Sequence, residues 1–165
     1  MPDRLSAMRK KWEWASPDVD MSVVEIVGGV KHAQALLDLL LEPVFEAAAV
    51  SSSEFDLLLH LHRVGGPATA RRLATSMSRS PAALSKSLTK LERRGLVERE
   101  AHPADGRAML VSLTDAGKGA LDEIMPRRLA VEGQAFSGLN AGQRTRIVES
   151  LDTLISALET PAPAE

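Results

Sequence analysis

Apolar residues recur along most of the chain at intervals of three and four, which is typical of amphipathic helices. The N-terminal segment carries one such set: Leu5, Met8, Trp12 and Ala15. We therefore predict an extra N-terminal helix within residues 1–20, ended by Ser16 and Pro17. A second helix is predicted from near Ser22, which opens a Ser-x-x-Glu capping box, to about Phe45.

Three shorter helices are predicted in the middle of the chain. Ser51 opens another Ser-x-x-Glu capping box, and the helix that follows it ends at the Gly65–Pro67 turn. The next helix covers residues 69–77. Ser80 and Pro81 suit the N-cap and the first position of a further helix, because proline there sacrifices no intrahelical hydrogen bond.

A β-hairpin is predicted next, because Gly95 ends that helix and an alternating pattern extends from about Leu96 to Leu113. The alternation places Met109, Val111 and Leu113 on one side and Leu110 and Ser112 on the other. Asp105 and Gly106 are turn formers and precede this run. The stretch around them is therefore expected to be the hairpin tip.

Two longer helices complete the pattern. Thr114 caps the first, in which Pro126 predicts a kink. Asn140 opens an Asn-x-x-Gln capping box at the start of the second. The second helix has a wide apolar stripe formed by Ile147, Leu151, Leu154, Ile155 and Leu158. Residues 161–165 are predicted to be a disordered tail.

The composition limits the classes of protein to consider. A chain of 165 residues with 44% apolar content fits one domain with a hydrophobic core. It has no cysteine, which excludes a thiol nucleophile, a disulfide framework and a cysteine zinc site. No apolar run approaches the roughly 20 residues that span a bilayer, and the N-terminus lacks the apolar core of a signal peptide. We expect a cytoplasmic protein without a membrane partner.

Charge is unevenly distributed although the formal net charge is only −2. Between Arg63 and Arg107 there are ten bases and four acids, a formal charge of +6, whereas the rest of the chain carries −8. A basic centre suits a polyanion such as DNA. A solvated basic face without a partner is the alternative on charge alone.

The helix that begins at Pro81 has two different faces. Leu84, Leu88 and Leu91 are four and three residues apart and are expected to face the core. The opposite face carries Ala82, Ser85, Lys86, Thr89, Lys90 and Arg93. Two short helices joined by a tight turn and followed by a hairpin have the order of a winged helix-turn-helix. An ordinary amphipathic surface helix is the alternative.

This outward face, together with Ser80 at the helix start, is suited to the major groove of DNA. Small side chains let the helix backbone approach the DNA, and Ser85 and Lys86 can reach the edges of the nucleobases or the phosphates. The basic side chains further along the helix, Lys90 and Arg93, suit phosphates. Arg107 at the hairpin tip can enter an A·T-rich minor groove, and Asp105 can direct its guanidinium. Taken alone, Asp-Gly-Arg is more often a plain turn.

The segments LSKSLTKLERRGLVERE and HPADGRAMLVSLTDAGK resemble the recognition helix and wing of the MarR family of bacterial transcription regulators. The resemblance implies a mainly α-helical fold with a small β-hairpin wing. It places a winged helix-turn-helix in residues 51–113, between N- and C-terminal dimerisation helices in residues 21–50 and 114–160. It assigns DNA contacts to Ser85, Lys86, Lys90, Asp105 and Arg107. Gly106, where many relatives have a base, is a departure.

The N-terminal arm resembles the urate-responsive branch of the family, in which an anionic or phenolic effector lies between this arm and the DNA-binding lobe. The matching positions are Trp12, Asp56, Arg63 and Arg99. Asp56, His60 and Arg63 also form one polar stripe on a leucine-rich helix, where a cation could pair with a carboxylate. Ser87 stands where that branch has an arginine for the effector's charge, so another aromatic or carboxylate effector fits equally. The alternative is a structural Asp56–Arg63 salt bridge.

Taken together, these features predict a homodimeric, ligand-responsive repressor that a small effector releases from a palindromic operator. The apolar stripe of the last helix favours a dimer, and packing within the monomer is the alternative. A helical protein-interaction module that does not read DNA is the competing function. We predict no enzyme, because the chain lacks a Gly-rich phosphate loop and a nucleophile elbow. The four histidines lack zinc-motif spacing, so we also predict no metal or cofactor.

Overall fold

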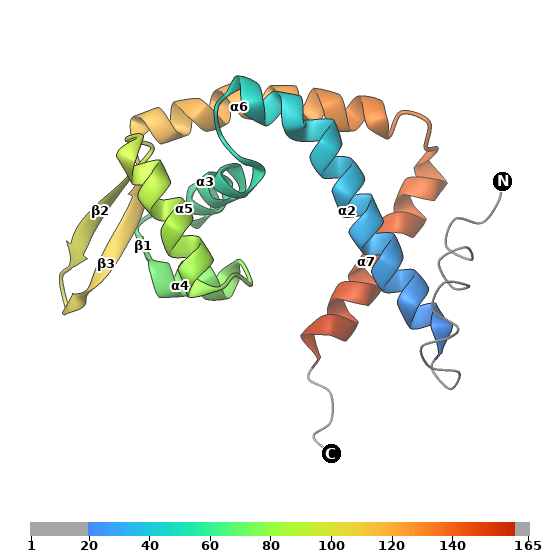
Figure 1. Ribbon diagram of the computed structural model, residues 1–165, viewed down its shortest axis with the longest axis horizontal. Coiled ribbons are helices and arrows are strands. Elements are labelled where there is room, and N and C mark those ends of the chain that lie inside the picture. The colour runs from blue at the N-terminus through green and yellow to red at the C-terminus, as the bar shows by residue number, and fades with distance from the viewer. Residues whose placement is uncertain (1–19, 161–165) are drawn as a thin grey trace, which may run out of the picture. The chain divides into compact units, whose positions relative to one another are not determined.

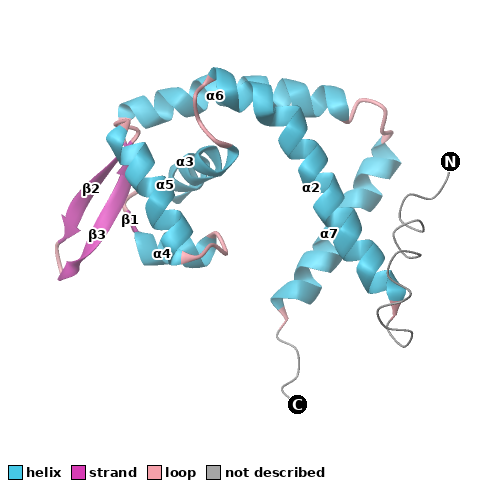
Figure 2. Ribbon diagram, viewed as in Figure 1, coloured by secondary structure: helices cyan, strands magenta, loops and turns pink. Residues whose placement is uncertain are grey.

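The computed structural model describes residues 20–160, and it is mainly helical with one small antiparallel sheet (Figures 1 and 2). In chain order the elements are α2 (Met21–Ala47), α3 (Ser52–Val64), β1 (Ala68–Thr69), α4 (Ala70–Ser76), α5 (Pro81–Arg93), β2 (Val97–His102), β3 (Asp105–Leu113), α6 (Asp115–Ala135) and α7 (Ala141–Glu159). This order confirms the predicted fold class. The helix predicted in residues 1–20, with Trp12, and the predicted tail 161–165 lie outside the described residues.

The chain divides into two compact units, residues 1–128 and residues 129–165. The first unit contains α2 to α5, the sheet and most of α6. The second contains the end of α6 and all of α7. Pro126 lies inside α6, which continues through Ala135, and the predicted kink stays a prediction.

The helix ends follow the predicted caps with one exception. A capping box joins Ser51 and Glu54 at the start of α3, and Gly65 ends that helix with a φ of 70°. The Ser80 hydroxyl accepts from the Ala83 N–H at the start of α5. The predicted cap at Ser22 is wrong.

Asp20 caps α2 instead. Its Oδ1 accepts from the Ser22 N–H at 2.9 Å, so Ser22 lies within the first turn. The carboxylate accepts this bond without being buried, and the bond lowers the pKa of Asp20 below its usual value. Aspartate and serine are both good N-caps, and the capping-box spacing of Ser22 does not show that Asp20, two residues earlier, takes this position.

The sheet has the strand order β1-β3-β2, and both pairings are antiparallel. β2 and β3 form the predicted hairpin, with Arg99 opposite Val111. β1 lies on the other side of β3, with Ala68 also opposite Val111. A two-residue strand is too short to produce an alternating pattern, which explains why the sequence did not predict β1.

The core of the first unit lies where α3, α4 and α5 pack on the base of the hairpin (Figure 1). Its most buried residues are Phe55, Leu57, Leu58, Leu73, Leu84, Leu88, Leu91, Val97, Val111 and Ile124. Val111 is 1% exposed, whereas Met109 on the same side of β3 is 44% exposed. The alternation therefore marks the buried face correctly, but the hairpin extends past the helices that cover it.

Close packing joins the start of α6 to the end of α5. The Thr114 hydroxyl donates to the Gly95 carbonyl at 2.6 Å and accepts from the Gly117 N–H at 3.0 Å. A Cβ on Gly117 would overlap the Leu96 carbonyl oxygen and lie 2.7 Å from the Leu113 side chain. Only glycine fits at this contact.

The second unit exposes much of its apolar surface. A capping box joins Asn140 and Gln143 at the start of α7, as predicted, and none of the residues of α7 is buried. Ile147, Leu151 and Ile155 of the predicted stripe are each about half exposed. Among residues 20–160, no helix combines the length and apolarity needed to span a bilayer.

Candidate functional site

The α5 helix presents the face that the sequence predicted. Leu84, Leu88 and Leu91 are at most 1% exposed and fix the orientation of the helix on the core. The candidate contacts Ser80, Ala82, Ser85, Lys86, Lys90 and Arg93 are all exposed. Small residues near the N-terminus and bases further along therefore lie on one accessible surface, which suits the major groove of DNA.

Thr89 differs from the other candidates on this helix because it is only partly exposed. Its hydroxyl accepts from Arg99 Nη2 at 3.3 Å. Arg99 Nε also lies 3.1 Å from Glu92 Oε2. These contacts join β2 to α5, and they hold the Arg99 side chain against α5.

Glu54 has a second role that the sequence did not reveal. Besides completing the capping box of α3, its buried carboxylate lies 3.9 Å from Lys90 Nζ and 3.7 Å from Arg94 Nη1. Lys90 thus has an acidic neighbour on its inner side while its side chain stays 54% exposed. The capping-box spacing could identify Glu54, but no local pattern predicts its partners 36 and 40 residues later.

The hairpin places the wing candidates at its tip. Asp105 begins β3 and pairs in register with His102, and the strand irregularity lies between Ala101 and His102. Arg107 follows two residues later in the same strand. The predicted acid and base of the wing therefore share one strand end.

Asp56 and Arg63 line one small pocket of about 270 Å³, together with His60 and with Arg79 from the turn between α4 and α5. His60 Nε2 is 2.7 Å from Ser76 Oγ. Asp56 does not form an ion pair with Arg63. Its two carboxylate oxygens each lie 3.7 Å from an arginine, Oδ2 from Arg79 and Oδ1 from Arg128.

The predicted effector residues are therefore only partly brought together. Asp56 and Arg63 share a pocket, whereas the contacts of Arg99 are with α5. Trp12 lies outside the described residues. Arg79 belongs to the pocket although no local sequence pattern pointed to it.

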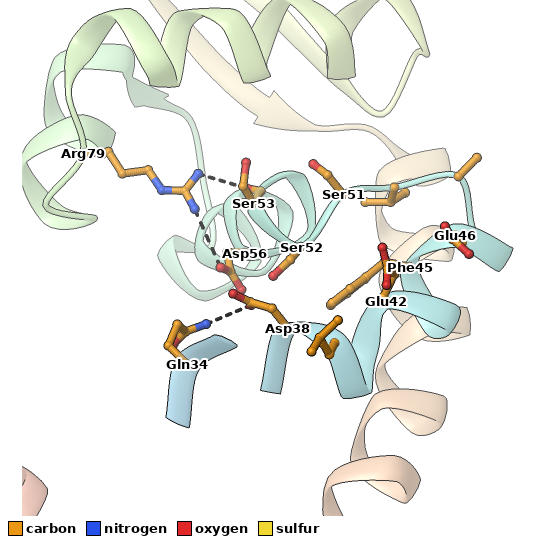
Figure 3. A pocket seen from close by; sticks show the side chains of 13 residues that line it. Gln34, Asp38, Glu42, Phe45, Glu46, Ser51, Ser52, Ser53, Asp56 and Arg79 are labelled. Atoms are coloured by element: carbon orange, nitrogen blue, oxygen red, sulfur yellow. Dashed lines mark hydrogen bonds and ion pairs between the residues drawn. The ribbon is translucent and has the colours of Figure 1, made fainter. Parts of the chain in front are cut away.

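A larger pocket of about 620 Å³ lies between the C-terminal half of α2 and the start of α3 (Figure 3). Asp56 and Arg79 form part of its wall too, so the two pockets share this ion pair. Three further acids line it: Asp38, Glu42 and Glu46. Among the described residues that line it, Arg79 is the only base, so an anion entering this pocket would meet a single cation.

The sequence profile of the MarR family matches residues 50–108, which contain α3, the helix-turn-helix and most of the hairpin. This segment of the chain is therefore similar to the DNA-binding region of the MarR family. The findings together support a MarR-family transcription regulator, and the similar proteins are regulators, not enzymes. Within the part of the chain described, no group of three His, Asp or Glu side chains could hold a metal ion.

Three known proteins illustrate the similarity. The transcriptional repressor NicR of Pseudomonas putida is 26% identical over 156 residues, which cover 92% of this chain and 98% of NicR. A Streptomyces coelicolor regulator in complex with DNA superimposes with a TM-score of 0.74 at 24% identity, and the match covers 89% of this chain and 93% of that regulator. Bordetella bronchiseptica BpsR, whose DNA binding is regulated by 6-hydroxynicotinic acid, gives a TM-score of 0.70 at 22% identity. The match covers 79% of this chain and 98% of BpsR.

Proposed function

We propose that the protein is a homodimeric repressor that binds a palindromic operator and is released from it by a small aromatic or anionic effector. The single observation that carries the proposal is the orientation of α5. Three buried leucines hold its apolar side on the core, so that Ser85, Lys86 and the neighbouring bases project from the molecule. A helix presented in this way can enter the major groove.

The residues proposed to contact DNA are those that the sequence indicated: Ser80, Ala82, Ser85, Lys86, Thr89, Lys90, Arg93, Asp105 and Arg107. The contacts of Thr89 with Arg99 and of Lys90 with Glu54 suggest a division of roles among them. We propose that these two residues set the position of α5, and that the more exposed Ser85 and Lys86 read the duplex.

A dimer is supported by the apolar surface that a single chain leaves in solvent. In the second unit Ile147, Leu151 and Ile155 form an exposed stripe, and in the first unit Val23 and Val27 of α2 are about half exposed. Apolar patches of this kind typically form protein interfaces. A twofold dimer would present two copies of α5 to half-sites about one helical turn apart, roughly 34–36 Å.

An effector site is supported by the pocket that contains Asp56, His60 and Arg63. Arginine forms strong charge-assisted hydrogen bonds with carboxylates, so an aromatic acid is the class of ligand that this pocket favours. Trp12 and Arg99 remain proposed effector residues by resemblance to the urate-responsive branch. A regulator of this kind acts on DNA, and we propose that it works in the cytoplasm.

Release of the protein from a duplex tests the proposal. The duplex from upstream of the protein's own gene, labelled with fluorescein, is first saturated with protein and then titrated with salicylate, urate or 6-hydroxynicotinic acid. We expect at least one of these to lower the anisotropy at low salt without unfolding the protein. Specific binding that none of them changes would contradict the effector part, and an absence of specific binding would favour the protein-interaction module.

A further inference from the structure

Arg79 joins the α3 helix to the turn that leads into the recognition helix. Its Nη1 donates to the Ser53 carbonyl at 3.0 Å, and its Nη2 lies 3.7 Å from Asp56 Oδ2 (Figure 3). Both acceptors belong to the first two turns of α3. We infer that Arg79 is the positioning residue through which an effector acts on α5, an inference that rests on the proposed function.

The place of Arg79 in the chain connects it directly to the DNA-reading helix. Ser80, the N-cap of α5, is the next residue, and Pro81 follows as the first residue of the helix. On the other side, Ser78 has a φ of 50°, a left-handed conformation that is uncommon for a residue with a side chain. A shift of Arg79 therefore moves the start of α5, the helix that carries Ser85 and Lys86 on its exposed face.

The contact between Arg79 and Asp56 is of a kind that an anion can replace. The two charged groups are 3.7 Å apart, and the side chains are 24% and 44% exposed. Partly exposed pairs at such distances contribute little net stability. Arg79 also borders three cavities, of about 270, 620 and 630 Å³, so its guanidinium can be reached from several sides.

Asp56 keeps a partner when Arg79 leaves. Its Oδ1 lies 3.7 Å from Arg128 Nη1, and the Arg128 guanidinium in turn lies over the Phe55 ring at 5.2 Å. His60 meanwhile keeps the end of α4 attached to α3 through its contact with Ser76. Displacement of Arg79 thus leaves no isolated carboxylate, and the change is confined to the turn before α5.

In this arrangement an effector competes with the α3 acceptors, Asp56 and the Ser53 carbonyl, for the Arg79 guanidinium. A carboxylate effector beside Arg63 attracts the Arg79 guanidinium and repels the Asp56 carboxylate, so Arg79 exchanges its α3 acceptors for the effector. The recognition helix then loses its attachment to α3 at its N-terminal end. The ligand changes operator affinity because it binds preferentially to the state in which Arg79 is displaced.

The variant Asp56→Asn separates this mechanism from simple electrostatics. Removing a negative charge from a DNA-binding protein should by itself leave affinity unchanged or raise it. Because the variant removes the ion pair between Arg79 and α3 while keeping the cation and its bond to the Ser53 carbonyl, we expect it instead to weaken operator binding about threefold to tenfold with no effector present. Asp122→Asn, which removes an exposed acid on α6, is the matched control and should not weaken binding.

The variants Arg79→Gln and Arg79→Lys complete the test. Arg79→Gln should weaken operator binding to a similar extent and leave the salt dependence unchanged. Loss of a direct phosphate contact would instead make the negative slope of log affinity against log salt shallower by about 0.9. Arg79→Lys should restore part of the affinity. Salicylate should release the wild type and have a smaller effect on Asp56→Asn and Arg79→Gln.

Three results would overturn the inference. The first is operator binding by Asp56→Asn that equals or exceeds that of the wild type. The second is release of Arg79→Gln by salicylate at the same concentration as the wild type. The third is a wild-type protein that does not bind the operator, which removes the proposed function and this inference with it. A wild type that binds the operator but is not released by salicylate overturns the effector part of the inference, and weaker binding by Asp56→Asn then supports the positioning role of Arg79 alone.

Discussion

The buried carboxylate of Glu54 lies 3.7 Å from the guanidinium of Arg94, and so the first turn of α3 is paired with the end of α5. The same carboxylate lies 3.9 Å from Lys90 and accepts from the Ser51 N–H at 2.9 Å. One side chain therefore caps a core helix and fixes the C-terminal half of α5. Arg79 has the corresponding role at the N-terminal end of α5, through Ser53 and Asp56.

Two substitutions of Glu54 separate its cap from its ion pairs. Glutamine at this position still suits a capping box, so Glu54→Gln should lose only the pairs and destabilise the fold by about 1 kcal/mol. Glu54→Ala should lose the pairs and the cap, at a cost of about 2 kcal/mol. Urea unfolding of both variants measures the difference. Equal losses would contradict a contribution from the cap.

The two glycines near the start of α6 should respond to alanine in opposite directions. Gly117→Ala forces a Cβ against the Leu96 carbonyl and the Leu113 side chain, and should destabilise the protein by about 1–3 kcal/mol. A Cβ on Gly119 would meet no heavy atom within 4 Å, so Gly119→Ala should stabilise by about 1 kcal/mol through helix propensity. Thermal unfolding distinguishes them, and a destabilising Gly119→Ala would show that the helix there is under another constraint.

Lys86 should be the most informative single basic residue for testing DNA recognition. Its exposed side chain follows Ser85 on the outer face of α5, and Lys86→Ala should weaken operator binding by about 1–3 kcal/mol. Arg127→Ala is a suitable control, because Arg127 lies on α6 and pairs with Glu123 at 3.2 Å. Fluorescence anisotropy with operator and scrambled duplexes measures both. Equal losses for Lys86→Ala and Arg127→Ala would argue against a DNA contact at Lys86.

A charge on the apolar stripe of α7 should disrupt the dimer. Leu151 is 46% exposed and lies within the stripe, so Leu151→Glu should raise the dimer dissociation constant at least about tenfold. Thr153 is two residues further along and on another side of the helix, and Thr153→Glu should leave the dimer intact. Analytical ultracentrifugation gives both constants. An unchanged Leu151→Glu dimer would place the interface elsewhere.

Local sequence patterns predicted most of the fold, because helix ends depend on neighbouring residues. Ser51, Ser80 and Asn140 cap the helices that they were expected to cap, and Gly65 and Gly95 lie in left-handed conformations at helix ends. Local pattern failed at the start of α2, which Asp20 caps in place of the predicted Ser22. It also failed for β1, whose two residues are defined only by pairing with β3.

The candidate sites were harder to predict, because they depend on contacts between distant segments. The outward face of α5 follows from helix periodicity, and the sequence identified it. The partners of Asp56 do not follow from helix periodicity, since Arg79 and Arg128 lie 23 and 72 residues further along the chain. The i, i+7 spacing of Asp56 and Arg63 placed them on one pocket wall but could not show that Asp56 pairs with other arginines.

Sequence-specific DNA reading by α5 and the wing is the property on which the proposed function depends. The most direct test is a competition titration, in which the labelled duplex from upstream of the protein's own gene is displaced by unlabelled copies of itself or of a scrambled duplex of equal length, at two salt concentrations. We predict that its own duplex competes at least about 10³-fold more effectively, and that affinity falls as salt rises. Equal competition by the two duplexes would contradict sequence-specific binding.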